Sequence, residues 1–171
     1  DVPADPSGSA DASFSFMSGD ATATFECQLD GGGYAACESP KTYTGLAGGT
    51  HTFDVRAIDG IGNIDPTPAS YTWWIDRDAP DTSLTDVPSD PGSSRNISIG
   101  FESDDPTATF ECQLDGGGYD VCTSPQTYTG LAYGYHFFEV RAVDTAGNPD
   151  PTPSSLGWTI THSTFLPIII K

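Results

Sequence analysis

Residues 107–122 read TATFECQLDGGGYDVC, and residues 22–37 read TATFECQLDGGGYAAC. The two stretches differ only in the two residues before the last cysteine. Each opens with β-branched and aromatic residues, which favour strands, and then turns at successive glycines, which accept positive φ. Strand, turn and return strand predict a β-hairpin. The chain therefore carries one hairpin twice.

A shift of 85 positions overlays nearly the whole chain on itself without a gap. The overlay pairs residues 39–70 with 124–155, Trp73 with Trp158, and 1–6 with 86–91. Self-similarity of this length indicates two copies of one small domain. About seven short strands per copy, separated by Gly, Pro and Asp turns, are typical of an immunoglobulin-like sandwich. We predict an all-β chain of two tandem sandwiches, with domain 1 at 1–76, domain 2 at 77–161 and a C-terminal segment at 162–171.

The strands are read most easily in the second copy. At 96–102, Ile97, Ile99 and Phe101 share one face, as period-2 alternation requires. The longest strand is expected at 136–143, with Phe138, Val140 and Ala142 on one face and His136 grouped with Phe137, Glu139 and Arg141 on the other. Further strands are expected near 82–85, 107–114, 127–129 and 155–160, together with the return strand that reaches Cys122.

The repeated pattern Y-T-G-L-A-x-G-x-H-x-F-x-V-R-A-x-D-x-x-G-N covers residues 43–63 and 128–148. It resembles bacterial Ig-like and fibronectin-type-III-like modules of secreted surface proteins. The resemblance implies that Leu46, His51, Leu131 and His136 are corner and core residues. Such modules serve as spacers, adhesins or filament subunits, so the resemblance implies the fold more strongly than the function.

Four cysteines form two equally spaced pairs, Cys27 with Cys37 and Cys112 with Cys122. An even count at matched spacing favours disulfides, and disulfides favour an oxidising location outside the cell. A zinc site is the weaker alternative, because the spacing is wrong and no CxxC occurs. We expect a secreted prokaryotic protein at the cell surface.

The formal net charge is −18, from 24 acidic and 6 basic side chains. Binding nucleic acid requires Lys and Arg to neutralise phosphates, so nucleic acid is not an expected partner. No apolar run approaches the roughly 20 residues that span a bilayer, so membrane insertion is not expected either. Monomers of such charge repel, and any self-association must rest on apolar and backbone contacts.

No catalytic constellation is visible, and we expect no enzymatic activity. His51 and His136 are repeat-equivalent, His162 stands alone, and no G-x-S-x-G motif occurs. We expect no metal or other cofactor. Calcium is a lesser alternative, because residues 59–65 and 144–150 offer loop oxygens, although turn chemistry explains both loops. Asn96 begins a formal glycosylation sequon and is a candidate site for an attached glycan. Glycans as binding partners belong to the carbohydrate-binding alternative given below.

The phase of the repeat is its most informative feature. The second copy is preceded by residues 78–85, whereas the first begins at Asp1, the equivalent of Asp86. We therefore expect the first copy to lack its own first strand, leaving an open edge and an apolar groove. The predicted acceptor groove comprises Phe14, Phe16, Trp73 and Ile75.

Residues 163–170 fall, by the same shift, where residues 78–85 would lie. The predicted donor strand is the apolar run Phe165, Leu166, Pro167, Ile168, Ile169 and Ile170. Exposed in water, this run would be prone to aggregate. Inserted into another subunit, it would complete that subunit's first domain and build a head-to-tail homopolymer. Ile169 takes the place of Leu84, with the register open by one residue because Pro167 cannot donate to a ladder.

Two alternatives remain open. In one, the chain is a tandem adhesin or carbohydrate-binding module and the tail is a sorting signal. Aromatic rings could then stack on sugars, the candidates being Tyr34, Tyr119, Tyr133 and Tyr135. In the other, the chain is an ordinary tandem surface module.

Overall fold

The computed structural model describes residues 1–162, and the predicted donor strand at 165–170 lies outside them. Two compact units are present, unit 1 at Asp1–Asp78 and unit 2 from Ala79 onward. Within the described part of the chain both units consist of strands and loops, without a helix. The predicted fold class, all-β with two sandwich units, is confirmed. Across residues 1–162 no helix is long and apolar enough to cross a membrane.

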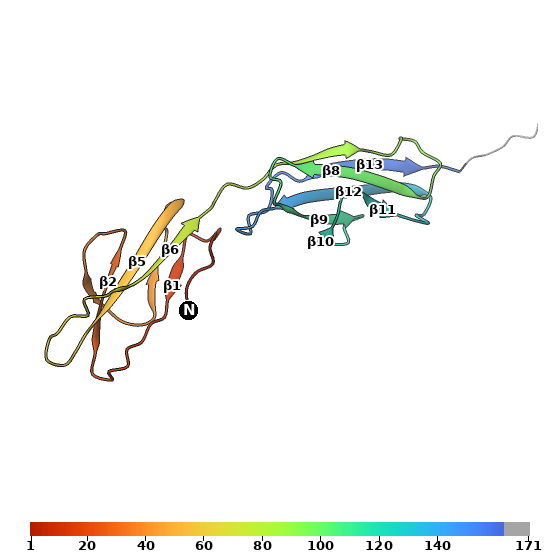
Figure 1. Cartoon of the computed structure of the whole chain (residues 1–171). Helices are drawn as coiled ribbons and strands as arrows, with labels where there is room; N and C mark the ends of the chain where they lie inside the picture. Colours follow the sequence, from red (N-terminus) through yellow and green to blue (C-terminus); the bar gives the residue numbers. More distant parts are fainter. Residues whose placement is uncertain (163–171) are drawn as a thin grey trace, which may run out of the picture. The chain divides into compact units, whose positions relative to one another are not determined.

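Unit 1 packs a four-stranded sheet against a two-stranded one. The larger sheet has the order β3-β2-β5-β6, and the smaller consists of β1 and β4. All neighbours are antiparallel. The bounds are β1 Ala12–Phe14, β2 Thr24–Leu29, β3 Ala35–Cys37, β4 Lys41–Tyr43, β5 Gly49–Ile58 and β6 Ala69–Ile75 (Figure 1).

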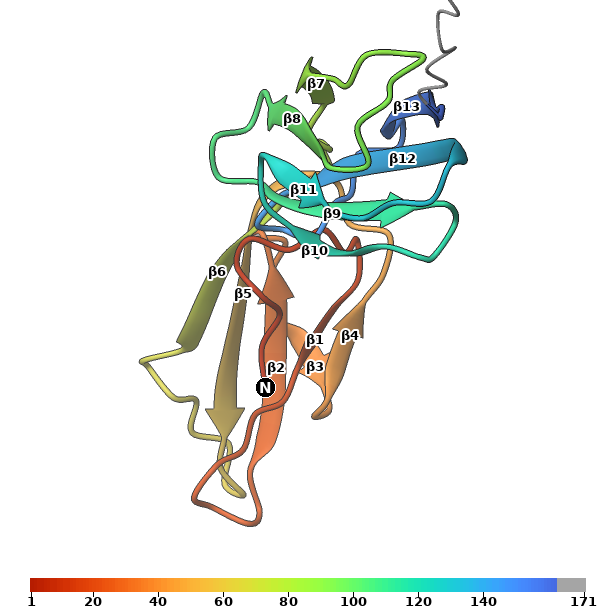
Figure 2. The same ribbon diagram turned by 90° about the vertical axis from the view of Figure 1, so that its right-hand side faces the viewer.

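Unit 2 repeats this arrangement and adds one strand. Its larger sheet has the order β10-β9-β12-β13, and its smaller sheet has three strands in the order β11-β8-β7. Figure 2 shows β7 beside β8 at the edge of this smaller sheet. The bounds are β7 Thr82–Asp86, β8 Ile97–Ser103, β9 Thr109–Leu114, β10 Asp120–Cys122, β11 Gln126–Tyr128, β12 Gly134–Val143 and β13 Ser154–Ile160.

Each unit buries its own core between its two sheets. In unit 1, Phe14 from β1 stacks on Phe53 from β5 with ring centroids 4.1 Å apart, and Trp73 packs edge-on against Phe14. In unit 2, Ile99 from β8 and Phe138 from β12 are fully buried. Burial of such side chains stabilises each unit by about 1.5–3 kcal/mol per residue.

One expected orientation is wrong. His136 was grouped with Phe137, Glu139 and Arg141, but it is buried, with 6 % of its surface exposed, on the same side of β12 as Phe138, Val140 and Ala142. Two-residue periodicity places positions 136, 138 and 140 on one face. A polar residue at the start of that face is buried because its ring nitrogens find partners.

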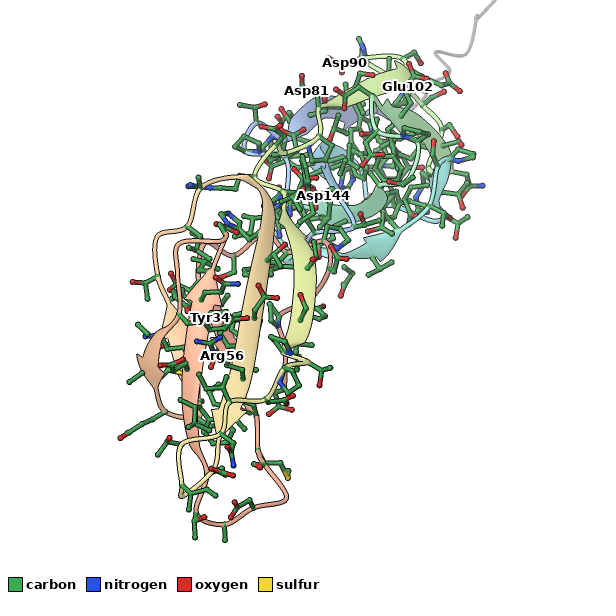
Figure 3. All side chains as sticks on the ribbon, turned by 60° about the vertical axis from the view of Figure 1, so that its left-hand side comes forward. Tyr34, Arg56, Asp81, Asp90, Glu102 and Asp144 are labelled. Atoms are coloured by element: carbon green, nitrogen blue, oxygen red, sulfur yellow. A yellow bond between two sulfur atoms is a disulfide. The ribbon has the colours of Figure 1, made fainter. Side chains whose placement is uncertain are left out.

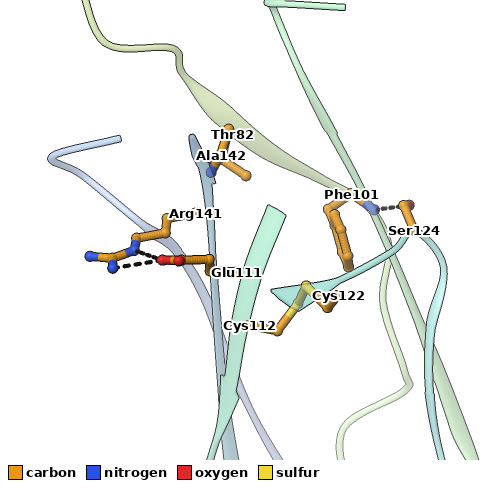
Figure 4. The surroundings of a disulfide bond; sticks show 8 residues. All are labelled: Thr82, Phe101, Glu111, Cys112, Cys122, Ser124, Arg141 and Ala142. Carbon is orange, nitrogen blue, oxygen red and sulfur yellow. Dashed lines mark hydrogen bonds and ion pairs between the residues drawn. A yellow bond between two sulfur atoms is a disulfide. The ribbon is translucent and has the colours of Figure 1, made fainter. Parts of the chain in front are cut away.

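Both predicted disulfides are confirmed. Cys27 on β2 bonds to Cys37 on β3, and Cys112 on β9 bonds to Cys122 on β10, with Cα atoms 5.8 Å apart in each pair. Each bond crosses a hairpin whose turn contains glycines with positive φ, such as Gly31 and Gly116 (Figure 4 shows the second disulfide). Disulfides favour an extracellular location, where thiols are not kept reduced.

Candidate functional site

The strand that unit 2 has and unit 1 lacks is anchored by Thr82. The Thr82 N–H donates to Asp150 Oδ2 at 2.9 Å, and the Thr82 hydroxyl accepts from the Ala142 N–H at 2.8 Å. The Thr82 carbonyl accepts from the Ser154 hydroxyl at 2.7 Å. Figure 4 shows Thr82 beside the Ala142 nitrogen. These bonds tie β7 to β12 and β13 of the opposite sheet, so β7 closes one side of the sandwich.

Alternate residues of this segment point inward. Pro80 is buried, and Thr82 and Leu84 are half-buried, whereas Asp81, Ser83 and Thr85 are exposed. Leu84 lies opposite Phe101 of β8 and packs on the core of unit 2. The inward face of the segment therefore comprises positions 80, 82 and 84.

No described residue takes the place of Thr82–Thr85 in unit 1. The Ser15 N–H donates to the Asp1 carbonyl at 2.9 Å, so Asp1 stands where Asp86 stands beside Gly100. The positions that β7 covers in unit 2 are more exposed in unit 1. Phe101, Ala142 and Asp150 are buried, with 3 %, 0 % and 2 % exposed, whereas their equivalents Phe16, Ala57 and Asp65 are only half-buried.

Two hollows follow the course of the absent strand. The first, which we call the aromatic hollow, has a volume of about 200 Å³ and is lined by Val2, Phe14, Phe16, Phe53, Val55 and Tyr71. The second, the acidic hollow, has about 240 Å³ and is lined by Asp20, Ala23, Ala57, Asp59, Ile64 and Asp65. Phe16 is the equivalent of the residue facing Leu84, and Ala57 of the residue bonded to Thr82. Both hollows thus mark positions that β7 would occupy.

The predicted groove residues divide between wall and interior. Phe14 and Phe16 line the aromatic hollow. Trp73 and Ile75 instead lie inside the core of unit 1, each with 1 % exposed. Sequence reasoning missed Val2, Phe53, Val55 and Tyr71. Phe53, Val55 and Tyr71 lie on β5 and β6 of the opposite sheet. Two-residue alternation gives the face of each strand, but the packing of the two sheets decides which strands line the hollow.

The expected corner residues hold the start of β5 and β12. His51 contacts Asp30 Oδ2 through Nδ1 at 2.7 Å and the Ala47 carbonyl through Nε2 at 2.9 Å. The Ala47 carbonyl, followed by the Asp30 carboxylate, raises the pKa of His51 above its usual range, although burial lowers it in part. His136 repeats the arrangement with Asp115 and Ala132. With both ring nitrogens engaged, neither histidine is free to act as a general base.

Of the four tyrosines proposed for sugar stacking, two are covered by arginine side chains, whereas Tyr133 and Tyr135 are exposed, Tyr133 at 46 %. The Arg56 guanidinium lies 3.9 Å from the centre of the Tyr34 ring and pairs with Glu26 at 2.7 Å (Figure 3). Arg141 covers Tyr119 in the same way, at 4.2 Å. Tyr133 stacks on His162, with ring centroids 3.5 Å apart. Tyr135 remains 67 % exposed.

The two candidate calcium loops use their first aspartate as a turn acceptor. Asp59 Oδ1 accepts from the Ile61 and Asn63 amides at 3.0 and 2.8 Å, and these bonds lower the pKa of Asp59. Asp144 accepts from the Asn148 amide at 2.7 Å. Across residues 1–162 no three His, Cys, Asp or Glu side chains gather as a metal site.

Asn96, the sequon residue, also has a structural partner. Its Oδ1 accepts from the Gly130 N–H at 2.9 Å, and Asp11 makes the equivalent bond to Gly45 in unit 1 at 3.0 Å. The side chain at this position therefore holds a glycine turn in both units, although only Asn96 belongs to a sequon.

Comparison with known proteins supports the fold. No family model and no curated protein matches the sequence of the chain. Among solved structures, the fibronectin(III)-like modules of Clostridium thermocellum CbhA are similar, with a TM-score of 0.62, 17 % identity and coverage of 96 % of each chain. Two weaker similarities have TM-scores of 0.33 and 17 % identity. One is to Bacteroides ovatus SGBP-B in complex with a mixed-linkage heptasaccharide, covering 95 % of this chain and 44 % of that one. The other is to a tetra-tandem repeat in the extending region of a large adhesion protein, covering 91 % and 46 %. In fold, the chain is a pair of tandem fibronectin(III)-like sandwich modules.

Proposed function

We propose that the chain is a structural subunit of an extracellular filament, in which residues 163–170 of one copy fill the open strand position in unit 1 of the next. The observation that carries this proposal is the difference between the two units. Unit 2 closes its sandwich with β7, whereas unit 1 has no described strand there and presents the aromatic and acidic hollows instead. An unpaired strand edge beside an apolar groove is the feature that strand addition uses.

Two features of residues 163–170 support them as the segment that fills the open strand position: their place in the 85-residue repeat and their apolar side chains. Residues 163–170 align with residues 78–85, the segment that contains most of β7. At the inward positions, Pro80, Thr82 and Leu84 are replaced by Phe165, Pro167 and Ile169, a more apolar set. Burying three such side chains releases about 4–9 kcal/mol. Ordering the segment offsets part of this gain, and backbone pairing adds to it.

Charge supports a contact made of apolar side chains and backbone. The chain carries −18, so copies repel one another. Residues 163–171 contain no acidic side chain and one lysine. The donated segment therefore adds no negative charge to a groove that already contains Asp20, Asp59 and Asp65. Assembly is expected to strengthen as salt screens the remaining repulsion.

The proposed role is structural, without enzymatic activity, and the partner is another copy of the chain. The disulfides suit a protein that functions outside the cell. Because both corner histidines are held by two partners, the chain offers no obvious proton-transfer group at either corner.

Sedimentation of the whole 171-residue chain over a wide concentration range, with negative-stain microscopy of the same samples, tests the proposal. We expect concentration-dependent oligomers and fibres with a two-unit repeat. A matched variant in which residues 165–170 are replaced by Ser, Gly and Asn should remain monomeric. Monomers of the unaltered chain at every concentration, or fibres that persist in the variant, would overturn the proposal.

A second candidate is a tandem adhesive or carbohydrate-binding module. Trp74 is 49 % exposed and Tyr135 is 67 % exposed, and each offers a ring to a sugar face. Binding of the chain to a glycan array, lost in Trp74→Ala and Tyr135→Ala variants with unchanged folding, would favour this candidate.

A further inference from the structure

Resting on the proposed function, we infer that the donated strand enters unit 1 in one register, with Phe165, Pro167 and Ile169 facing inward and Leu166, Ile168 and Ile170 facing outward. In this register Ile169 lies opposite Phe16 at the aromatic hollow, and Pro167 lies beside Ala57 at the acidic hollow. The hydrogen bonds of β7 in unit 2 and the single proline of the tail together select it.

The bonding pattern of β7 shows which positions tolerate proline. The Asp104 N–H donates to the Asp81 carbonyl at 3.2 Å, so residues 81 and 104 form a hydrogen-bonded pair. In an antiparallel ladder such pairs alternate with non-bonded ones, so Ser83 and Glu102 form the next bonded pair and Thr82 lies between them. The Thr82 N–H accordingly points away from β8, to Asp150. A proline at position 82 therefore removes no bond from the ladder.

Two of the three hydrogen bonds that Thr82 makes in unit 2 are not needed in unit 1. Ser154, whose hydroxyl donates to the Thr82 carbonyl, is replaced by Ala69. Asp65, the equivalent of Asp150, already accepts from the Thr67 N–H and hydroxyl at 2.8 and 2.7 Å. It is half-buried, so water reaches it. Asp150 accepts the same two bonds from Thr152, so only Ala69 and the access of water to Asp65 remove the need for the Thr82 bonds to Ser154 and Asp150. The Ala57 N–H would lack the acceptor that the Thr82 hydroxyl gives to Ala142, which is a cost of this register.

Slipping the tail by one residue is disfavoured. Pro167 would then stand at position 81 or 83, in a hydrogen-bonded pair, and the ladder would lose an N–H donor. The same slip would turn Ile169 out of the aromatic hollow, because neighbouring residues of a strand point to opposite faces.

A shift of the tail by two residues keeps the same side chains facing inward, but it places an unsuitable residue at one end of the strand. In one direction Lys171 takes the place of Leu84 and brings a charged group to the aromatic hollow, which lacks a carboxylate in its lining. In the other direction Ile169 takes the place of Asp86, which Asp1 already holds beside Ser15. One register remains.

Matched single variants of the whole chain test the register, with the concentration at which oligomers form measured by sedimentation. Replacing an inward residue, in Ile169→Ser or Phe165→Ser, should raise that concentration by about tenfold or more. The outward variant Ile168→Ser should change it by less than about threefold. Ile168→Pro should abolish assembly, because it removes an N–H from a hydrogen-bonded pair.

The outcomes separate this inference from the proposed function. If Ile168→Ser disrupts assembly as strongly as Ile169→Ser, or more strongly, the register is wrong and strand donation stands. If Ile168→Pro assembles normally, the register is again wrong. If none of the variants changes the oligomers, residues 163–170 are not the occupant, and the proposed function fails with the register.

Discussion

The hydroxyl of Thr82 accepts a hydrogen bond from the N–H of Ala142 at 2.8 Å, which joins β7 of one sheet to β12 of the other. Ala142 is fully buried, so its N–H has no access to water. In unit 1 the equivalent Ala57 is half-buried and has no described counterpart of Thr82. The contrast between these two alanines is the clearest local sign of the strand that unit 2 has and the described part of unit 1 lacks.

Thr82→Val should destabilise unit 2. The substitution keeps the shape of the side chain but removes the acceptor for a buried N–H, at a cost of about 1–3 kcal/mol. Hydrogen exchange at the Ala142 amide, combined with urea unfolding of the chain, measures the loss. Thr85→Val serves as the control, because Thr85 is exposed and its side chain points to the opposite face of the segment from that of Thr82. Equal stability of the two variants would show that the bond does not hold β7.

Removing the disulfide of either unit should lower the free energy of unfolding of that unit, by a similar amount in both cases. Each bond closes a loop with a sequence separation of 10, for which chain entropy predicts a loss of about 2–3 kcal/mol. The paired variants Cys27→Ala with Cys37→Ala and Cys112→Ala with Cys122→Ala should lower the urea midpoints of their own units. Reduction of the unaltered chain should reproduce both shifts. A variant pair with an unchanged midpoint would contradict the stabilising role.

The stability of both units should depend on pH through the corner histidines. The Ala132 carbonyl, and then Asp115, raise the pKa of His136, while burial lowers it in part, and the folded state binds the proton more tightly than the unfolded chain. This stabilisation is fully present below the unfolded pKa of about 6.5 and is lost as pH rises through the raised folded pKa. Urea midpoints at pH 5.5 and pH 9 measure it.

The double variant His51→Gln with His136→Gln should lose most of that pH dependence. An amide keeps hydrogen-bonding capacity but does not titrate in this range. If the variant retains the slope of the unaltered chain, other groups are responsible for it.

The stack of Tyr119, Arg141 and Glu111 should make a modest contribution to the stability of unit 2. Arg141 is 30 % exposed and Glu111 32 %, so solvent screens their ion pair. Together the pair and the ring contact are worth about 1 kcal/mol. Arg141→Ala should lower the free energy of unfolding of unit 2, measured by urea unfolding, by about 1 kcal/mol, and a double-mutant cycle with Tyr119→Ala should show coupling. Independent effects of the two substitutions would contradict a stack.

Most of the fold could be predicted from the repeat, because two-residue alternation and glycine turns are local signals. The depth at which a side chain lies within the core could not be predicted in this way. Trp73 and Ile75 alternate as groove residues would, yet they lie inside the core, since alternation gives the face of a strand and not the layer above it. The burial of His136 depends on Asp115 and the Ala132 carbonyl, and the sequence around the strand does not show that these partners lie beside the ring.

The covering of two tyrosine rings by arginine side chains could not be predicted from local patterns either. Tyr34 and Tyr119 beside the glycine turns were candidates for sugar stacking, but Arg56 on β5 and Arg141 on β12 cover them across the intervening strand. The contact depends on two registers, β3 on β2 and β2 on β5, and single-residue patterns give neither of them. The lack of a described counterpart of β7 in unit 1, by contrast, could be predicted from the phase of the repeat.

The most direct measurement of the central claim is a covalent cross-link between copies. In the proposed register Ile168 of one copy lies opposite Met17 of the next, as Ser83 lies opposite Glu102. Met17 is 92 % exposed, and the four native cysteines are all paired. Mild oxidation of a chain carrying Met17→Cys and Ile168→Cys should give a ladder of disulfide-linked oligomers on a non-reducing gel, whereas each single variant should stop at dimers. Monomers alone from the double variant, with or without an internal bond, would contradict assembly by strand donation.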